Sequence, residues 1–243
     1  MKNPIEIGLK IKIYLDGANI EDVIKIGKED YISGFTSNPS LMSKSGITNY
    51  NDFIEKFTDL ENDKPISFEV VSDTLEDMEI DARKINSFKG NIYIKIPITN
   101  SIGQTTLPLI KKLLDEKFKI NVTAILTENQ MIDLINILEK NDDVIISYFA
   151  GRVADTGRDP IIVIKKINEL IKHKGLLKAK TLWASPREVL NIYQANDAGV
   201  DIITVTKDLI KKLELYQKNL NEYSLETVKM FLNDAIKNNL KIK

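Results

Sequence analysis

The sequence of 243 residues contains no cysteine and only one histidine. The absence of cysteine excludes disulfides, thiolate metal sites and cysteine nucleophiles, and it is typical of a reducing compartment. A Ser-His-Asp triad or a multi-histidine metal site would depend on His173 alone, which stands between Lys172 and Lys174 in a run typical of a helix end. No cluster of metal ligands is visible, and we expect chemistry that needs no metal.

The sequence also lacks an excess of charge of one sign and long apolar runs. Its 34 Lys and Arg residues against 35 Asp and Glu residues give a net charge of −1, so it has no electrostatic footprint for nucleic acid or an acidic membrane. No apolar stretch reaches roughly 18 residues, the length that crosses a bilayer, and the first residues lack the apolar run of a signal peptide. We therefore expect a cytoplasmic protein without a nucleic-acid or membrane partner.

Short runs rich in β-forming residues alternate with longer runs of helical periodicity. We predict eight strands, at Ile11–Asp16, Ile32–Asn38, Ile66–Val71, Ile92–Ile98, Ile120–Leu126, Val144–Gly151, Thr181–Ser185 and Ile202–Thr206. Such alternation predicts parallel strands joined by right-handed crossovers, and eight units in a chain of this length favour a closed (β/α)8 TIM barrel of the α/β class. The alternative is a doubly wound open sheet, but no glycine-rich nucleotide-binding loop follows any of the strands.

We expect one domain over residues 1–243, with the barrel over about 11–213 and a helical extension over about 214–243. The extension contains an amphipathic helix from about Ser224 to Lys237, which is surplus to a minimal barrel and makes a homo-oligomer plausible. Helix starts are also legible. Thr127-x-x-Gln130 is a capping box, and Asn38-Pro39 and Ser185-Pro186 each place a capping residue before a proline at the first helical position.

The strands can be divided by face, because alternate residues of a strand point to opposite sides of the sheet. In the fourth strand four isoleucines share one face, and Tyr93, Lys95 and Pro97 share the other. If the more apolar face of each strand meets the helices, a set of polar side chains points into the barrel. These are Asp16, Glu69, Lys95, Asn121, Thr123 and Ser185, with Trp183 on the same face as Ser185.

Buried charge is costly unless it is paired, so this interior composition predicts a functional site. A lysine in an apolar enclosure has its charged form disfavoured, and a neutral amine can attack a ketone to form an iminium that acts as an electron sink. A carboxylate then takes the proton from the hydroxyl whose carbon leaves. Such imine chemistry needs no cofactor. Arg152 and Arg187 close or follow predicted strands, and their guanidinium groups suit a phosphate.

Six motifs, each at a strand end, resemble the transaldolase family in order and spacing from about residue 11 to 213. They are Tyr14-Leu15-Asp16, Thr36-Ser37-Asn38-Pro39-Ser40, Lys95-Ile96-Pro97-Ile98-Thr99, Asn121-Val122-Thr123, Phe149-Ala150-Gly151-Arg152 and Ala184-Ser185-Pro186-Arg187. The short chain resembles the subgroup of small transaldolases and fructose-6-phosphate aldolases.

The resemblance implies a role for each site residue. Lys95 would form the Schiff base, Asp16 would be the general base and acid, and Glu69 and Thr123 would hold the water used in imine formation. The substrate would contact Asn38, Asn121, Ser147, Phe149 and Ser185, and its phosphate would bind Arg152 and Arg187. The substrate is thus expected to be a sugar phosphate.

Three functions follow as alternatives. The first is transfer of a dihydroxyacetone unit between sugar phosphates, which Phe149 and Glu69 favour, because the resemblance associates tyrosine and glutamine at these places with aldolases that release free dihydroxyacetone. The second is an aldolase with another donor or acceptor. It is suggested by Pro186, which departs from the larger transaldolases, and by the less familiar segment Ala154–Asp159, which contains a second arginine at Arg158. The third is a barrel that binds without catalysis. Each residue also has a structural alternative: helix capping for Asn38 and Ser185, and salt bridges for the two arginines.

Overall fold

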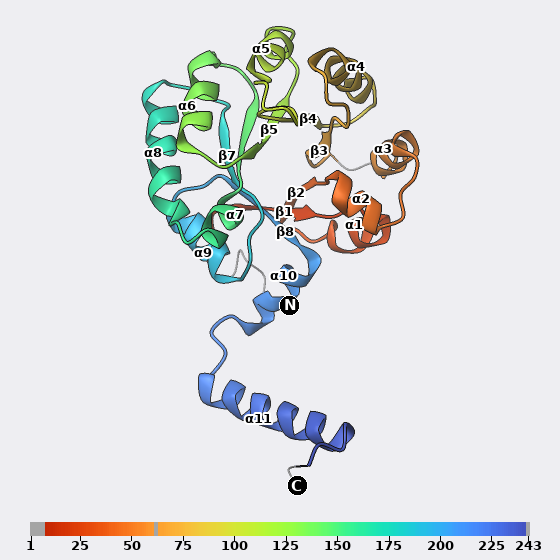
Figure 1. Cartoon of the computed structure of the whole chain (residues 1–243), viewed down its shortest axis with the longest axis vertical. Coiled ribbons are helices and arrows are strands. Elements are labelled where there is room, and N and C mark those ends of the chain that lie inside the picture. Colours follow the sequence, from red (N-terminus) through yellow and green to blue (C-terminus); the bar gives the residue numbers. More distant parts are fainter. Residues whose placement is uncertain (1–7, 61–62, 242–243) are drawn as a thin grey trace.

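Eight parallel strands close into a barrel in which each strand pairs with its neighbours in the sequence and β8 pairs with β1 (Figure 1). This computed structural model describes residues 8–60 and 63–241. The strands are β1 (Lys12–Asp16), β2 (Ile32–Thr36), β3 (Ile66–Glu69), β4 (Ile92–Pro97), β5 (Ile120–Ile125), β6 (Val144–Tyr148), β7 (Lys180–Trp183) and β8 (Ile202–Thr206). The predicted TIM barrel is confirmed.

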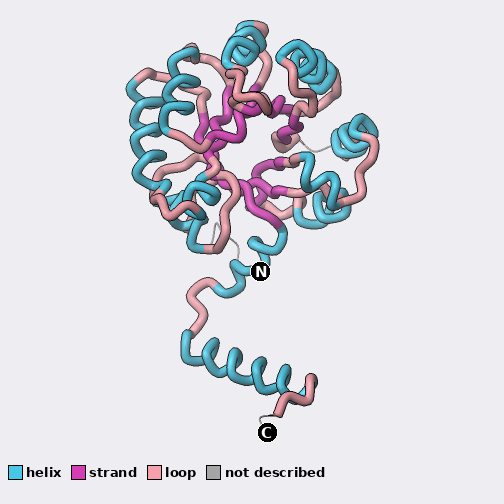
Figure 2. The backbone as a smooth tube through the Cα atoms, viewed as in Figure 1, coloured by secondary structure: helices cyan, strands magenta, loops and turns pink. Residues whose placement is uncertain are grey.

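Helices surround the strands as an outer layer, except for the last helix of the chain, which lies apart from the barrel (Figure 2). They are α1 (Ile20–Ile26), α2 (Pro39–Lys44), α3 (Tyr50–Thr58), α4 (Leu75–Asn86), α5 (Leu107–Asp115), α6 (Glu128–Ile137), α7 (Ala150–Asp155), α8 (Pro160–His173), α9 (Leu190–Asp197), α10 (Lys207–Lys211) and α11 (Leu220–Lys237), with a 3-10 turn, η1, at Lys212–Leu215. The sixth predicted strand was three residues too long, because α7 already begins at Ala150.

Two apolar cores follow from the alternation of side chains along the strands. Residues such as Ile94 and Ile96 pack between strands and helices, whereas a second cluster fills the barrel interior. The interior cluster consists of Tyr14, Tyr93, Ile145, Leu182, Ala184 and Ile202. For β1 and β4 the predicted faces are therefore confirmed, since Tyr14 and Tyr93 lie inside. The barrel is filled below the level at which its polar side chains begin.

The predicted face of β7 was wrong. Leu182 and Ala184 lie in the interior cluster, and Trp183 packs in the outer core. Each face of this strand carries one polar and one apolar residue, Lys180 with Leu182 and Thr181 with Trp183, so the two faces differ too little in polarity for the rule of turning the more apolar face outward. Ser185 adopts a left-handed conformation, with φ of 61°, and this turn of the backbone brings it to the cavity despite its parity.

Of the three predicted helix starts, two are confirmed. Thr127 and Gln130 form the capping box, and Asn38 accepts a hydrogen bond from the Leu41 N–H at 3.0 Å. The capping role of Ser185 was wrong. The helix after β7 begins only at Leu190, and the intervening turn is held by Asn191, whose side chain accepts the Arg187 N–H at 2.7 Å.

The chain leaves the barrel after α10 and η1, and α11 extends away from it (Figure 1). This helix begins at Leu220, four residues before the predicted start, because the Asn219 side chain accepts the N–H groups of Asn221 and Glu222. None of its residues is buried. Residues 1–7, 61, 62, 242 and 243 of the predicted domain lie outside the described residues, and the division into a barrel and an extension stays a prediction. Within the described residues, no helix combines the length and apolarity needed to cross a membrane.

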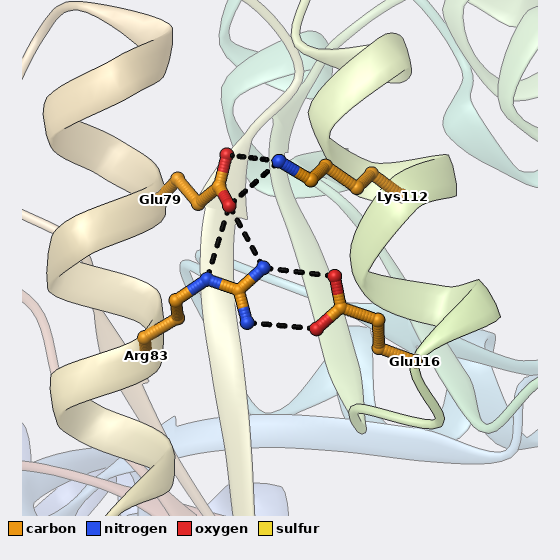
Figure 3. A network of polar contacts seen from close by, with 4 residues as sticks. All are labelled: Glu79, Arg83, Lys112 and Glu116. Atoms are coloured by element: carbon orange, nitrogen blue, oxygen red, sulfur yellow. Dashed lines mark hydrogen bonds and ion pairs between the residues drawn. The ribbon is translucent and has the colours of Figure 1, made fainter.

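An ion-pair network joins α4 to α5 on the outside of the barrel (Figure 3). Arg83 binds Glu79 at 2.8 Å in its own helix and Glu116 at 2.7 Å just beyond α5, and Lys112 binds Glu79 at 2.8 Å. Hydrogen bonds from Lys112 and Arg83 lower the pKa of Glu79, and those from Arg83 lower the pKa of Glu116. The network is solvent-exposed, so screening keeps its contribution modest.

We expect Arg83→Met to lower the melting temperature at pH 7 and to do so much less in acid. A carboxylate whose pKa is lower in the folded state stabilises the fold above its unfolded pKa of about 4.3, and this stabilisation is lost as the pH falls through the folded pKa. Thermal melts of both proteins between pH 3 and 7 test this, with Lys84→Met, which removes a lysine lying over the Phe88 ring of the same segment, as control. An undiminished difference at pH 3 would contradict it.

Candidate active site

A cavity of about 100 Å³ opens among the carboxyl ends of the strands. This is the end of an α/β barrel that carries functional sites, because the loops there can vary without disturbing the barrel. The cavity is lined by Asp16, Thr36, Asn38, Lys95, Asn121, Thr123, Ser147, Phe149, Arg152, Leu182, Ala184, Ser185 and Thr204. Nine of the eleven predicted site residues are therefore brought together here, contributed by β1, β4, β5 and β6 and the segments that follow β2, β6 and β7.

Lys95 lies at the centre of this arrangement because β4 pairs with β3 on one side and β5 on the other. In that register Glu69 and Asn121 flank it directly. Its ammonium lies 2.9 Å from a Glu69 carboxylate oxygen and donates to the Ser37 carbonyl at 3.1 Å. The residue is only 7% exposed. Glu69, which is not among the cavity-lining residues, therefore acts on the cavity through Lys95 by compensating its buried charge.

Asp16 ends β1, on the opposite wall of the barrel from β5. It accepts a hydrogen bond from the Thr36 hydroxyl at 2.8 Å. Burial raises the pKa of this carboxyl above its ordinary value; the charge of Lys95 and the Thr36 hydrogen bond act to lower it, and the charge of Glu69 raises it. A carboxylate with a raised pKa takes up a proton more readily near neutral pH, as a general base must do.

Hydrogen bonds hold the side chain of Asn121 in β5, whereas that of Thr123 in the same strand lacks them within the described part of the chain. The Ser147 hydroxyl donates to the Asn121 amide oxygen at 2.6 Å, and the Asn121 amide nitrogen donates to Ser67 at 2.9 Å. The Thr123 hydroxyl is buried and has no hydrogen-bond partner among the described residues. An unpaired buried hydroxyl is costly, so Thr123 is a candidate contact for a bound water or ligand. The predicted orientation of the β5 side chains is correct as far as Thr123. Ala124 then has a φ of 57°, and beyond it the side chains no longer alternate between the two faces as predicted.

The two predicted phosphate ligands differ in position. Arg152 lines the cavity, with its guanidinium 5.3 Å from the centre of the Phe149 ring. Arg187 does not line the cavity. It is ion-paired with Asp155 at the end of α7, and its side chain is 48% exposed. Arg152 is thus the one arginine among the cavity-lining residues, and a contact from Arg187 would first require release from Asp155.

The sequence analysis missed Thr36, Thr204, Leu182 and Ala184 as cavity residues. Thr36 stands inside one of the six motifs but was assigned no role. Thr204 could have been found by dividing β8 by face, because it shares its parity with Ile202 of the interior cluster. Asn38 both caps α2 and lines the cavity, so its capping role does not exclude the predicted contact with the substrate.

Gly151 allows α7 to approach the end of β7. A Cβ at this position would lie 1.6 Å from the Ser185 carbonyl oxygen. We expect Gly151→Ala to displace Ser185 or α7 and to lower the free energy of unfolding by about 1–3 kcal/mol, the usual cost of overpacking. Urea denaturation measures this, with Gly17→Ala, where no atom lies within 4 Å of an added Cβ, as control. Equal stability of Gly151→Ala and the unmodified protein would contradict it.

The fold and the cavity define an α/β-barrel protein whose site is centred on a buried, carboxylate-paired lysine. Residues 13–242 match the family model described as Transaldolase/Fructose-6-phosphate aldolase. The chain belongs to this family, and is an enzyme of the transaldolase and aldolase type.

Relatives carry names that agree with this assignment. The chain is 31% identical over 224 residues to the "Probable transaldolase" of Nitrosopumilus maritimus, and the aligned region covers 92% of this chain and 94% of the relative. It is 31% identical to "Probable transaldolase 1" of Listeria monocytogenes, over 80% of this chain and 86% of the relative.

Solved structures with lower identity are similar in fold alone. They include orotidine 5'-phosphate decarboxylase from Pyrococcus horikoshii, with a TM-score of 0.54, 20% identity and coverage of 80% of this chain and 89% of that one. The CutC protein of Streptococcus agalactiae has a TM-score of 0.56 at 13% identity, with coverage of 80% and 97%.

Proposed function

We propose that this protein is a class I transaldolase that transfers a dihydroxyacetone unit between sugar phosphates through a Schiff base on Lys95. The observation that carries the proposal is a single buried lysine at the cavity with a carboxylate 2.9 Å from its amine and a second carboxylate, Asp16, lining the same cavity. Family membership and the names of the relatives support the transfer reaction.

Each step has a residue within the site. Glu69 accepts the ammonium proton, and the free amine of Lys95 attacks the ketone carbon of the donor. The carbinolamine loses water to form the iminium, with Glu69 and the unpaired Thr123 hydroxyl moving protons through a bound water. Asp16 takes the proton of the C4 hydroxyl, the C3–C4 bond breaks and its electrons pass to the iminium nitrogen, which releases an aldose phosphate. The resulting enamine adds to the acceptor aldehyde, and hydrolysis frees Lys95.

The other cavity residues are proposed to bind the substrate. Asn38, Asn121, Ser147 and Ser185 present amide and hydroxyl groups to the donor's hydroxyls, and Phe149 closes the apolar side. Arg152 is the cationic side chain among the cavity-lining residues other than Lys95, so it is the first candidate for the phosphate. Family membership supports a cytoplasmic place for this reaction.

Borohydride trapping tests the proposal. The protein is incubated with fructose 6-phosphate, reduced, digested and analysed by mass spectrometry. We expect an adduct on the peptide that contains Lys95, and turnover that depends on an added aldose-phosphate acceptor. An adduct without acceptor dependence would replace transfer by simple cleavage, and no adduct with either fructose 6-phosphate or dihydroxyacetone would leave the binding-module alternative.

The second candidate is an aldolase of the same mechanism with another donor or acceptor. The pairing of Arg187 with Asp155 favours it, because one of the two predicted phosphate ligands is thereby held outside the cavity. Turnover with fructose 6-phosphate at a rate no higher than with unphosphorylated fructose would support this candidate.

We also propose a homo-oligomer formed through α11. Its exposed large apolar residues are Leu220, Tyr223, Leu225, Val228, Met230, Phe231, Leu232 and Ile236, with Leu240 just beyond. A surface of this extent on one helix is unusual for a monomer, and a second copy of the chain offers the same helix for mutual burial.

We expect the double substitution Leu225→Glu and Leu232→Glu to convert an oligomer to a monomer, because it places two charges on one apolar face of the helix. Light scattering coupled to size exclusion measures the mass. Asn233→Glu is the control, because Asn233 lies on the polar stripe of the helix with Glu226, Lys229 and Lys237. A monomeric unmodified protein at tens of micromolar would refute the oligomer.

A further inference from the structure

Two threonines extend from Asp16 into the wall of the barrel. Thr36 ends β2 and Thr204 lies in β8, the two strands that pair with β1 on either side. The Thr36 hydroxyl lies 2.8 Å from an Asp16 oxygen and 2.5 Å from the Thr204 hydroxyl. Both residues are buried, at 2% and 6% exposure. The closure of the barrel thus places three oxygen atoms in succession: the Thr204 hydroxyl, the Thr36 hydroxyl and one Asp16 carboxylate oxygen.

The direction of the hydrogen bonds in this line follows from the number of protons. An ionised carboxylate can only accept, so the single proton of the Thr36 hydroxyl is committed to Asp16. Thr36 must then accept in its contact with Thr204, and Thr204 must donate. The two hydrogen bonds, from Thr204 to Thr36 and from Thr36 to Asp16, therefore both point toward the carboxylate, and each polarises and strengthens the other.

A polarised chain of this kind has two effects on a buried carboxylate. It restricts the rotation of the side chain, because Thr36 holds one of the two carboxylate oxygens and leaves the other without this hydrogen bond. It also stabilises the charged form against burial. Two charged groups act on Asp16: Lys95 favours its ionised form and Glu69 disfavours it. The hydrogen bond from Thr36 favours the ionised form, as Lys95 does.

On the basis of the proposed function, in which Asp16 is the general base, we propose that Thr204 is a positioning residue that orients and keeps ionised the Asp16 carboxylate, and that it acts only through the Thr36 hydroxyl. Thr204 does not need to touch the reacting atoms for this role. A purely structural pair of threonines would contribute to stability without affecting the titration of Asp16, and the two roles can be separated by experiment.

The variants Thr36→Val, Thr204→Val and the double variant remove the hydroxyls at nearly constant volume, and Thr204→Ser restores one of them. We expect Thr36→Val to raise the midpoint of the acidic limb of kcat/KM against pH by about one unit, since charge-assisted hydrogen bonds are the strong ones, and to lower kcat more than it changes KM. Thr204→Val should shift the midpoint less and in the same direction. The double variant should match Thr36→Val, and Thr204→Ser should match the unmodified protein.

Additive shifts in the double variant, or an unmoved midpoint in Thr204→Val, would overturn the positioning role of Thr204. A carbon NMR titration of the Asp16 carboxyl, assigned with Asp16→Asn, gives the same test without turnover: its midpoint must rise in Thr36→Val and, by less, in Thr204→Val. Failure of the proposed function can be distinguished from failure of this inference. If the proposed function is wrong, the unmodified protein forms no adduct on Lys95. If only the role of Thr204 is wrong, the adduct still forms and the titration of Asp16 is unchanged in Thr204→Val.

Discussion

Replacing Lys95 by methionine should lower turnover by at least about 10⁴-fold, as expected for removal of the nucleophile of a covalent mechanism. Methionine fills a similar volume and has no amine, so the proposed conversion of the ketone to an iminium is blocked and the carbon–carbon bond is left without an electron sink. The borohydride adduct should disappear as well. No other residue can replace this function in the cavity, because Lys95 is the only lysine among its lining residues.

The measurement combines a steady-state assay with adduct trapping and a thermal melt. Lys119→Met is the matched control, since Lys119 precedes β5 at the opposite end of the barrel, where it donates to Asn91, and its loss should leave turnover within about twofold. Lys95→Met leaves the Glu69 carboxylate without its ion pair, so Lys95→Met combined with Glu69→Gln is used if the single variant melts early. Residual turnover above one hundredth of the unmodified rate would contradict the Schiff-base mechanism.

Replacing Asp16 by asparagine should lower kcat by about 10²–10⁴-fold while the Schiff base still forms, because proton transfer contributes in this range. The amide has the shape of the carboxylate and can still accept the Thr36 hydroxyl, but it cannot take a proton from the C4 hydroxyl. We therefore expect borohydride to trap an adduct on Lys95 that retains the whole donor carbon chain, which mass spectrometry distinguishes from the shorter dihydroxyacetone adduct.

The same variant should be at least as stable as the unmodified protein at neutral pH. A carboxyl whose pKa is raised by folding destabilises the folded state above that pKa, and this cost grows as the pH rises through it. Asparagine removes the cost. Asp143→Asn is the control, because Asp143 also accepts a hydroxyl hydrogen bond, from Tyr93 at 2.7 Å, but precedes β6 at the other end of the barrel. Normal turnover by Asp16→Asn would exclude Asp16 as the base.

Part of the site could be predicted from the sequence because its residues follow local rules. Lys95 and Glu69 sit on strands with a clear contrast between faces, and a parallel register brings strand ends to one edge, so their side chains had to meet. Asp16 and Thr123 were predicted for the same reason. Where the two faces of a strand differ little in polarity, as around Leu182 and Trp183 of β7, the predicted orientation of the side chains was wrong.

The sequence by itself determined the number and order of the strands, their alternation with helices, and the residues of β1, β3, β4 and most of β5 that point into the barrel, because two-residue and helical periodicities are local properties of the chain. Only the tertiary structure decided which hydroxyl groups are hydrogen-bonded to Asp16 directly or through Thr36. Thr204 is 168 positions from Thr36 in the sequence, and the two side chains meet only because β8 closes onto β1. It also decided that Arg187 pairs with Asp155 rather than facing the cavity, because a charged side chain binds the nearest opposite charge in space, and that neighbour is set by the packing of α7 against the turn after β7.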